Sequence, residues 1–259
     1  MAFIMRRTWG DSTRKIAGAI FILASQACSG SDSTGGGHGA RTPQDPALVD
    51  EREKMVVQQL EARGIRDEGV LAAMRNVQRH RFAPDLDPAR AYEDRPHPIG
   101  DGQTISQPYI VALMSELAQL EPPCRVLEVG TGSGYQAAVL ADMGCSVYTI
   151  EIIESLATRA RETLAAEGYD DRVQCRFGDG YRGWPEHAPF DAVIVTAAAP
   201  RIPQPLLDQL RVGGRLVIPV GDHWQVLEVH RRTSEGVIRE KVSDVRFVPM
   251  TGEVRRVPE

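Results

Sequence analysis

The sequence predicts an α/β fold whose sheet is mostly parallel and carries helices on both faces. The first observation is that short apolar segments alternate with helix-like segments from residue 125 onward, as in a parallel sheet. The second is that the last extended segments, 225–231 and 237–249, have no helix between them, so an antiparallel pair should finish the sheet. The expected strands lie near 125–129, 146–150, 173–177, 191–196 and 214–219, and the expected helices near 133–143, 153–167 and 203–211.

The elements before the sheet are expected to be helical, with an extended stretch in the middle. Residues 48–61 have a helical pattern, and residues 68–77 carry apolar side chains at the spacing of one helix face. Four prolines within 84–102 break any regular helix there. A third helix is expected over residues 109–120.

The first 45 residues differ in kind from the rest. Basic residues precede a short apolar stretch, 16–24, and a run of small residues that ends at Cys28, a candidate lipidation site. This pattern is typical of a secretory signal, and the apolar stretch is too short to span a bilayer. A glycine-rich linker follows. We therefore predict a leader and linker over 1–45 and one domain over 46–259, made of a helical substrate-side segment (46–122) and a cofactor-binding sheet (123–259). The alternative is a misassigned extension ahead of a start at Met55.

Composition limits the classes of protein and partner. A length of 259 residues allows one substantial core, and 42% hydrophobic with 25% charged residues is typical of a globular protein. The net charge is −5, and basic clusters with interleaved aromatics are absent, so nucleic acid is not expected as a partner. We expect a monomer that contacts a membrane only if the leader is retained or Cys28 is lipidated.

The cysteines and histidines predict neither a metal site nor a disulfide framework. Cys124, Cys145 and Cys175 start or lie within strand candidates, where a free thiol behaves as a small hydrophobe. No two cysteines form a C-x-x-C pair, and the histidines lack the spacing of metal ligands.

The most informative motif is Glu-Val-Gly-Thr-Gly-Ser-Gly at 128–134, between a strand candidate and a helix candidate. Glycines can take positive φ and have no Cβ, so a ligand can lie against bare backbone at a helix start. The dinucleotide-binding fingerprint has a different glycine spacing, and here an acid precedes the first glycine. The motif favours S-adenosylmethionine, and a tight turn without a ligand is the alternative.

Two further strand ends carry compatible chemistry. Glu151 ends the next strand candidate, 21 residues after Gly130, where a carboxylate can bind a ribose diol. Asp179 and Gly180 follow the third strand candidate, where a carboxylate or an amide can bind the adenine edge. Open α/β sheets bind ligands at the carboxyl ends of their strands, so all three should surround one ligand.

The segment 98–109 lies before the cofactor-binding sheet and ends at a helix start. Ser106 is a candidate helix N-cap, because serine satisfies free amides there. A hydroxyl beside free amides is also a cradle for an anion such as a substrate carboxylate. The two roles are compatible.

With this segment the sequence resembles the protein-L-isoaspartate O-methyltransferases. The resemblance runs roughly from Met55 to Thr251 and depends most on Gln-Thr-Ile-Ser-Gln-Pro at 103–108, since the glycine loop alone indicates only a class I methyltransferase. Other resembling segments are 126–141, 178–181, 189–191, 195–198, 219–221 and 247–249.

The resemblance implies a seven-stranded, Rossmann-like, doubly wound sheet and methyl transfer from S-adenosylmethionine to the free carboxylate of L-isoaspartyl residues in damaged proteins and peptides, a protein repair reaction. It implies that Ser106 is catalytic and binds substrate with Thr196 and Ala197. It implies cofactor contacts from Thr104, Ile105, Glu128, Gly130, Thr131, Gly132, Ser133, Gly134, Glu151, Asp179, Gly180 and Thr251.

Two other functions remain open from the residues alone. One is another class I methyltransferase acting on a small carboxylate or amine, and the other is a non-catalytic, exported binding module. Two observations favour different cellular locations: cofactor supply favours the cytoplasm, whereas the leader favours export or a lipid anchor.

Overall fold

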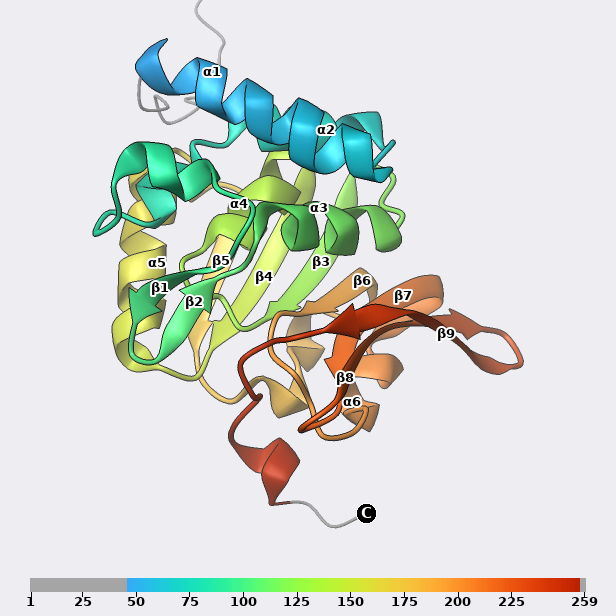
Figure 1. The fold of residues 1–259 in the computed structure, drawn as a ribbon. Coiled ribbons are helices and arrows are strands. Elements are labelled where there is room, and N and C mark those ends of the chain that lie inside the picture. Colours follow the sequence, from blue (N-terminus) through green and yellow to red (C-terminus); the bar gives the residue numbers. More distant parts are fainter. Residues whose placement is uncertain (1–45, 257–259) are drawn as a thin grey trace, which may run out of the picture. The chain divides into compact units, whose positions relative to one another are not determined.

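The computed structural model describes residues 46–256, so the predicted leader and linker lie outside the described residues. The main sheet has seven strands in the order β5-β4-β3-β6-β7-β8-β9 (Figure 1). The neighbours from β5 to β7 are parallel, and β8 and β9 are antiparallel, which confirms the predicted fold class. The strands are β3 (Cys124–Val129), β4 (Cys145–Glu151), β5 (Val173–Phe177), β6 (Phe190–Val195), β7 (Leu210–Val220), β8 (Gln225–Thr233) and β9 (Gly236–Val245).

Alternate residues of the central strands pack into two separate hydrophobic cores, one on each face of the sheet. Val126 and Val147 belong to the core that includes residues of α4 (Tyr135–Asp142) and α5 (Glu154–Ala166). Leu127 and Ile150 belong to the core that includes residues of α6 (Gln204–Asp208). Because both faces are covered, these strands are apolar along nearly their whole length. The structure has a shorter helix than the one predicted over 203–211, since β7 already begins at Leu210.

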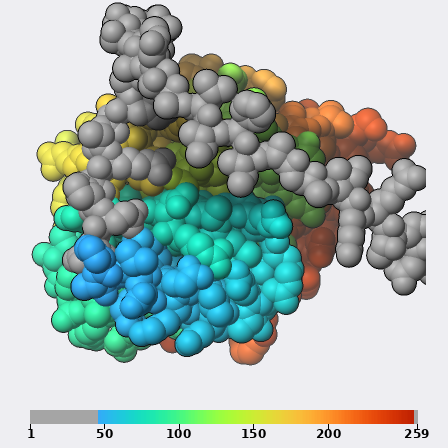
Figure 2. Space-filling model, turned by 90° about the horizontal axis from the view of Figure 1, so that it is seen from above, coloured from blue at the N-terminus to red at the C-terminus, as the bar shows by residue number. Residues whose placement is uncertain are grey.

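The N-terminal helices add a layer over one of these cores. Helix α1 (Pro46–Lys54) continues through a π-helical turn to residue 60, and α2 (Glu68–Asn76) and α3 (Pro108–Leu117) follow. Figure 2 shows the blue and cyan residues of this layer covering one face of the molecule. Leu48 and Arg52 of α1 are buried, so the folded part begins before Met55. None of the helices within residues 46–256 is long and apolar enough to cross a membrane.

The extended stretch expected over 84–102 contains structure that the sequence analysis missed. A short 3-10 helix covers Pro88–Tyr92, where Asp87 accepts a hydrogen bond from the Ala89 amide at its start. Strands β1 (His97–Gly100) and β2 (Gln103–Ile105) then form an antiparallel hairpin. Its turn holds Asp101 at φ +52 and Gly102 at φ +71, and Asp-Gly is a common pair in such turns.

The expectation of free cysteines is wrong for two of them. Cys124 and Cys145 form a disulfide, and Cys175 is free. The two paired residues start neighbouring parallel strands and lie opposite each other in the register of β3 and β4, with 4.5 Å between their Cα atoms. Residues 21 apart in sequence become neighbours only through the strand pairing, so spacing alone does not predict the bond.

Candidate active site

One cavity that is open to solvent lies at the carboxyl ends of β3 and β4. Separate parts of the chain line it: the hairpin and the residues after it, the glycine loop, the segments that follow β4, β5 and β6, and the C-terminal segment. Thirteen of the residues singled out in the sequence are among its lining: Thr104, Ile105, Ser106, Glu128, Gly130, Thr131, Gly132, Ser133, Glu151, Gly180, Thr196, Ala197 and Thr251. Gly134 and Asp179 are not.

The glycine loop between β3 and α4 forms one wall. The Gly130 amide donates to Ile150 O at 2.8 Å, and Gly130 has φ +98. A Cβ added there would overlap Thr196 Oγ1, whose hydroxyl donates to the Gly130 carbonyl. Gly134 lies behind this wall: a Cβ there would meet Leu164 of α5 at 3.2 Å, so its part is close packing of helix on helix. Glycine is therefore required at both ends of the loop for different reasons.

The Glu151 carboxylate holds this loop against the next strand. It is 5% exposed and accepts hydrogen bonds from the Gly132 amide at 2.8 Å and from the Ile153 amide at 3.0 Å. Both oxygens are therefore engaged by main chain while the carboxylate faces the cavity. The residue at the predicted position of a ribose contact is also the brace of the loop.

Glu128 is the second carboxyl group in the cavity wall, and its surroundings are quite different. It is fully buried; Oε2 accepts from Thr149 Oγ1 at 2.6 Å, and Thr149 is hydrogen-bonded to Thr131 of the loop at 2.6 Å. Oε1 has no hydrogen-bond partner within residues 46–256. Burial raises the pKa of Glu128 to about 8. An unpaired buried oxygen in a cavity wall fits a ligand that brings a donor or a positive charge.

Asp179 and Gly180 contribute differently from each other. Gly180 lines the cavity, and a Cβ there would overlap Val129. The Asp179 carboxylate instead accepts from the Tyr181 amide at 2.9 Å and the Glu253 amide at 2.6 Å. Asp179 thus anchors the C-terminal segment whose residues 248–251 line the cavity.

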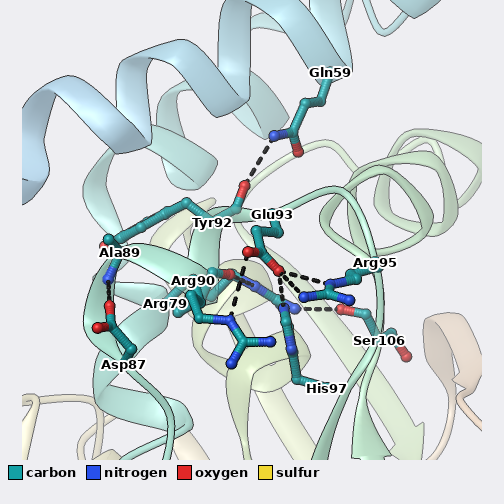
Figure 3. A network of polar contacts seen from close by, with 11 residues as sticks. Gln59, Arg79, Asp87, Ala89, Arg90, Tyr92, Glu93, Arg95, His97 and Ser106 are labelled. Atoms are coloured by element: carbon teal, nitrogen blue, oxygen red, sulfur yellow. Dashed lines mark hydrogen bonds and ion pairs between the residues drawn. The ribbon is translucent and has the colours of Figure 1, made fainter.

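Another wall of the cavity is the segment between β2 and α3. Ser106 is half-buried in the cavity wall, whereas the N-cap of α3 is Gln107, with Pro108 at the first helical position. The candidate capping role of Ser106 is therefore wrong. Its carbonyl accepts a hydrogen bond from Arg79 at 2.7 Å (Figure 3). Gln107 rather than Ser106 holds the N-cap position, and Ser106 remains part of the cavity lining.

Several lining residues were not predicted from the sequence. Tyr135 and Gln136 start α4 and are buried, and Gln136 donates to Ser115 of α3 at 2.8 Å. Met250 lies in the cavity wall because the C-terminal segment pairs with the segment that follows β6, where Met250 N donates to Ala198 O at 2.7 Å. A Tyr-Gln pair at a helix start resembles ordinary core, and nothing local marks residues 248–250 as neighbours of β6.

The sheet order, the glycine loop and the two strand-end carboxyls around one cavity define the class I S-adenosylmethionine-dependent methyltransferases. Residues 51–255 match the model of the protein-L-isoaspartate(D-aspartate) O-methyltransferases. The chain belongs to that family.

Individual relatives agree with this placement. A protein-L-isoaspartate O-methyltransferase of Gloeobacter violaceus is 59% identical over 201 residues, which cover 77% of this chain and 98% of the relative. One from Picosynechococcus is 55% identical over 78% of this chain and 90% of the relative. A solved Plasmodium falciparum structure, described as a protein-L-isoaspartate O-methyltransferase in complex with S-adenosyl-L-homocysteine, matches with a TM-score of 0.67 and 28% identity over 76% of this chain and 97% of that one.

Proposed function

We propose that this protein transfers a methyl group from S-adenosylmethionine to the free carboxylate of L-isoaspartyl residues in damaged proteins and peptides. The observation that carries the proposal is that one cavity joins Ser106 and its neighbours to the glycine loop and both strand-end carboxyls. Cofactor-binding and acceptor-binding chemistry thus meet in one space. Family membership supports the same substrate class.

The cofactor side is assigned to the glycine loop, the two carboxyls and Gly180. S-adenosylmethionine supplies a methyl group on a positively charged sulfonium. The backbone of residues 130–133 would lie against the ligand, Glu151 would bind a ribose diol, and Gly180 would leave room beside the third strand end. The unpaired oxygen of Glu128 in the cavity wall would suit a cationic ligand, because a nearby positive charge favours the ionised carboxylate. Thr104, Ile105 and Thr251 complete the wall.

On the acceptor side the protein's task is to orient a group that is already reactive. A substrate carboxylate has an unperturbed pKa of about 4, so it is ionised at neutral pH and needs no general base. Ser106 would donate its hydroxyl proton to one carboxylate oxygen and leave the other free to attack. Thr196 and Ala197 would contact the substrate main chain. An aligned and partly desolvated carboxylate gains rate through effective concentration.

We also propose that the protein acts as a monomer in the cytoplasm, where its cofactor is made. The alternative is export or lipid anchoring through the leader. Fractionation with N-terminal sequencing tests the location: protein found only in the envelope and processed near Cys28 would contradict the proposed cytoplasmic location.

A chain that starts at Pro46 is the appropriate shortened form for testing whether the leader is needed, because a start at Met55 removes α1 with its buried Leu48 and Arg52.

The function is tested by methyl transfer to a matched pair of synthetic peptides that contain either L-isoaspartate or L-aspartate at one position. We expect labelling of the isoaspartyl peptide and little labelling of the other, because a pocket around one carboxylate position tolerates little displacement. Equal labelling would contradict the repair function. Labelling of neither peptide, with cofactor binding intact, would favour another acceptor.

A further inference from the structure

The acceptor side contains a buried cation for which the proposed chemistry has no use. The Arg79 side chain is 0% exposed. The groups that favour its charged form are the phenol side chains of Tyr135 and Tyr92. Burial lowers the pKa of its guanidinium to about 10, and Nη1 has no hydrogen-bond partner within the described residues. An unpaired buried charge is costly, so its contacts should indicate why it is there.

Arg79 links two segments that are otherwise separate in sequence. Its Nε donates to Ala91 O at 2.6 Å, and its Nη2 donates to Ser106 O at 2.7 Å (Figure 3). Ser106 belongs neither to β2 nor to α3, so ladder and helix hydrogen bonds do not fix its main chain. A rigid, planar guanidinium can hold two carbonyls at a set separation, which a lysine ammonium on its flexible stem cannot do as well.

The same guanidinium also contacts the other side of the cavity. Its central carbon lies 4.8 Å from the ring centroid of Tyr135, the first residue of α4 directly after the glycine loop. Phe82, in the same 3-10 helix as Arg79, packs edge-on against that ring at 5.6 Å. Tyr135 and Ser106 both line the cavity. Arg79 therefore touches one residue on each side of the space in which acceptor and cofactor would meet.

We infer that Arg79 is a positioning residue: by holding the Ser106 carbonyl against the start of α4, it sets where the Ser106 hydroxyl stands relative to the glycine loop. The kinetic part of this inference rests on the proposed function, whereas the claim that Arg79 fixes the main chain at Ser106 does not. Arg79 acts through Ser106 and makes no contact of its own with the reacting groups.

The kinetic test is a double-mutant cycle of Arg79→Met and Ser106→Ala. We expect Arg79→Met to lower kcat on the isoaspartyl peptide by about 10- to 100-fold, the loss of a charged hydrogen bond, with cofactor affinity within about threefold of the wild type. In the Ser106→Ala background the same change should cost less than about twofold. Arg79→Lys should restore part of the loss. Arg81→Met is the matched control, because Arg81 lies in the same 3-10 helix, is 41% exposed and pairs only at 3.9 Å with Glu167.

Hydrogen exchange measured by mass spectrometry gives a readout without any acceptor. In Arg79→Met, exchange should accelerate in residues 103–109 and stay unchanged in residues 145–151 of β4, with no change in Arg81→Met. If Arg79→Met does not fold, Arg79→Lys replaces it in both experiments. Equal kinetic losses in both backgrounds, a parallel loss of cofactor affinity or uniformly faster exchange would each overturn the inference. If Arg79→Met shows the expected exchange pattern but the wild type methylates neither peptide, the result would contradict only the proposed function.

Discussion

The two sides of the cavity are built by different physical means. On the cofactor side, residues 128–134 and 151 act through main chain and strand ends, and their partners are fixed by the register of β3 and β4. On the acceptor side, Ser106 lies in an irregular segment held by a side chain 27 residues away. The first design depends on local backbone geometry and the second on one long-range buried contact. Substitutions on the two sides should therefore affect different steps.

The largest expected effect is on the cofactor side. Gly130→Ala should weaken cofactor binding by at least about 100-fold, because positive φ strains alanine and its Cβ would overlap Thr196. Calorimetry with S-adenosylhomocysteine measures the affinity. Gly64→Ala is the matched control, with φ +99 and no atom within 4 Å of an added Cβ. It should cost about 1 kcal/mol of stability and no affinity. If the two variants bound S-adenosylhomocysteine with equal affinity, the tight contact between Gly130 and Thr196 would not be the reason for glycine at this position.

Ser106→Ala should do the opposite. It should lower kcat by about 10- to 100-fold on the isoaspartyl peptide and leave cofactor affinity within about threefold, because it removes the proposed hydrogen bond to the acceptor. Steady-state kinetics and calorimetry measure the two quantities. Ser155→Ala is the control, since Ser155 is bonded to Asp101 outside the cavity lining. A Ser106→Ala protein that no longer binds cofactor would show that the two sides are not separable.

Glu151→Ala should weaken cofactor binding by roughly 1 to 3 kcal/mol, about 5- to 150-fold, as it removes both the proposed ribose contact and the hydrogen bond to the Gly132 amide. The exposed Glu154, at the start of α5, gives a control of the same charge. Unchanged affinity in Glu151→Ala by calorimetry would place the ribose contact elsewhere.

Glu128 should make the stability of the ligand-free protein depend on pH. Burial raises its pKa from 4.5 to about 8, so between these values the unfolded carboxyl is ionised while the folded one keeps its proton. Relative to Glu128→Gln, the wild type should lose stability as pH rises through this range and level off above about pH 8. Urea unfolding at about pH 5, 6.5 and 8.5 measures the difference. Parallel curves for the two proteins would mean that Glu128 titrates normally.

The smallest effect on chemistry is expected from the disulfide, because it lies at the opposite end of β3 and β4 from the cavity. The double substitution Cys124→Ser with Cys145→Ser should lower the free energy of unfolding of the oxidised protein by about 3 kcal/mol and leave kcat unchanged. The free energy of unfolding of the wild type, measured in the presence of a reductant, should match that of the variant. A change in kcat would show that strain at the strand starts reaches the cavity.

The contrast between the two sides also explains what could be predicted from the sequence. The strands, the glycine loop and Glu151 follow from apolar alternation, glycine spacing and the rule that parallel strands bind ligands at their carboxyl ends. The links between Arg79 and Ser106, and between Met250 and Ala198, follow from tertiary packing of segments that carry no local signal. Ser106 was a candidate anion-binding residue from its position before a helix, and the resemblance of residues 103–108 added the catalytic role. Its predicted capping role was wrong because Pro108 moves the helix start by one residue.

The bond between Cys124 and Cys145 has one more consequence, which concerns chain connectivity. It closes a covalent ring that contains β3, the glycine loop and α4. A protease that cuts once inside this ring, for instance after Arg125, leaves both products joined through the sulfur bridge. Cleavage there would be invisible on a non-reducing gel and would appear as two bands only after reduction. Within the described residues, the segment 124–145 is thus the one stretch in which a single cut leaves the two products covalently joined.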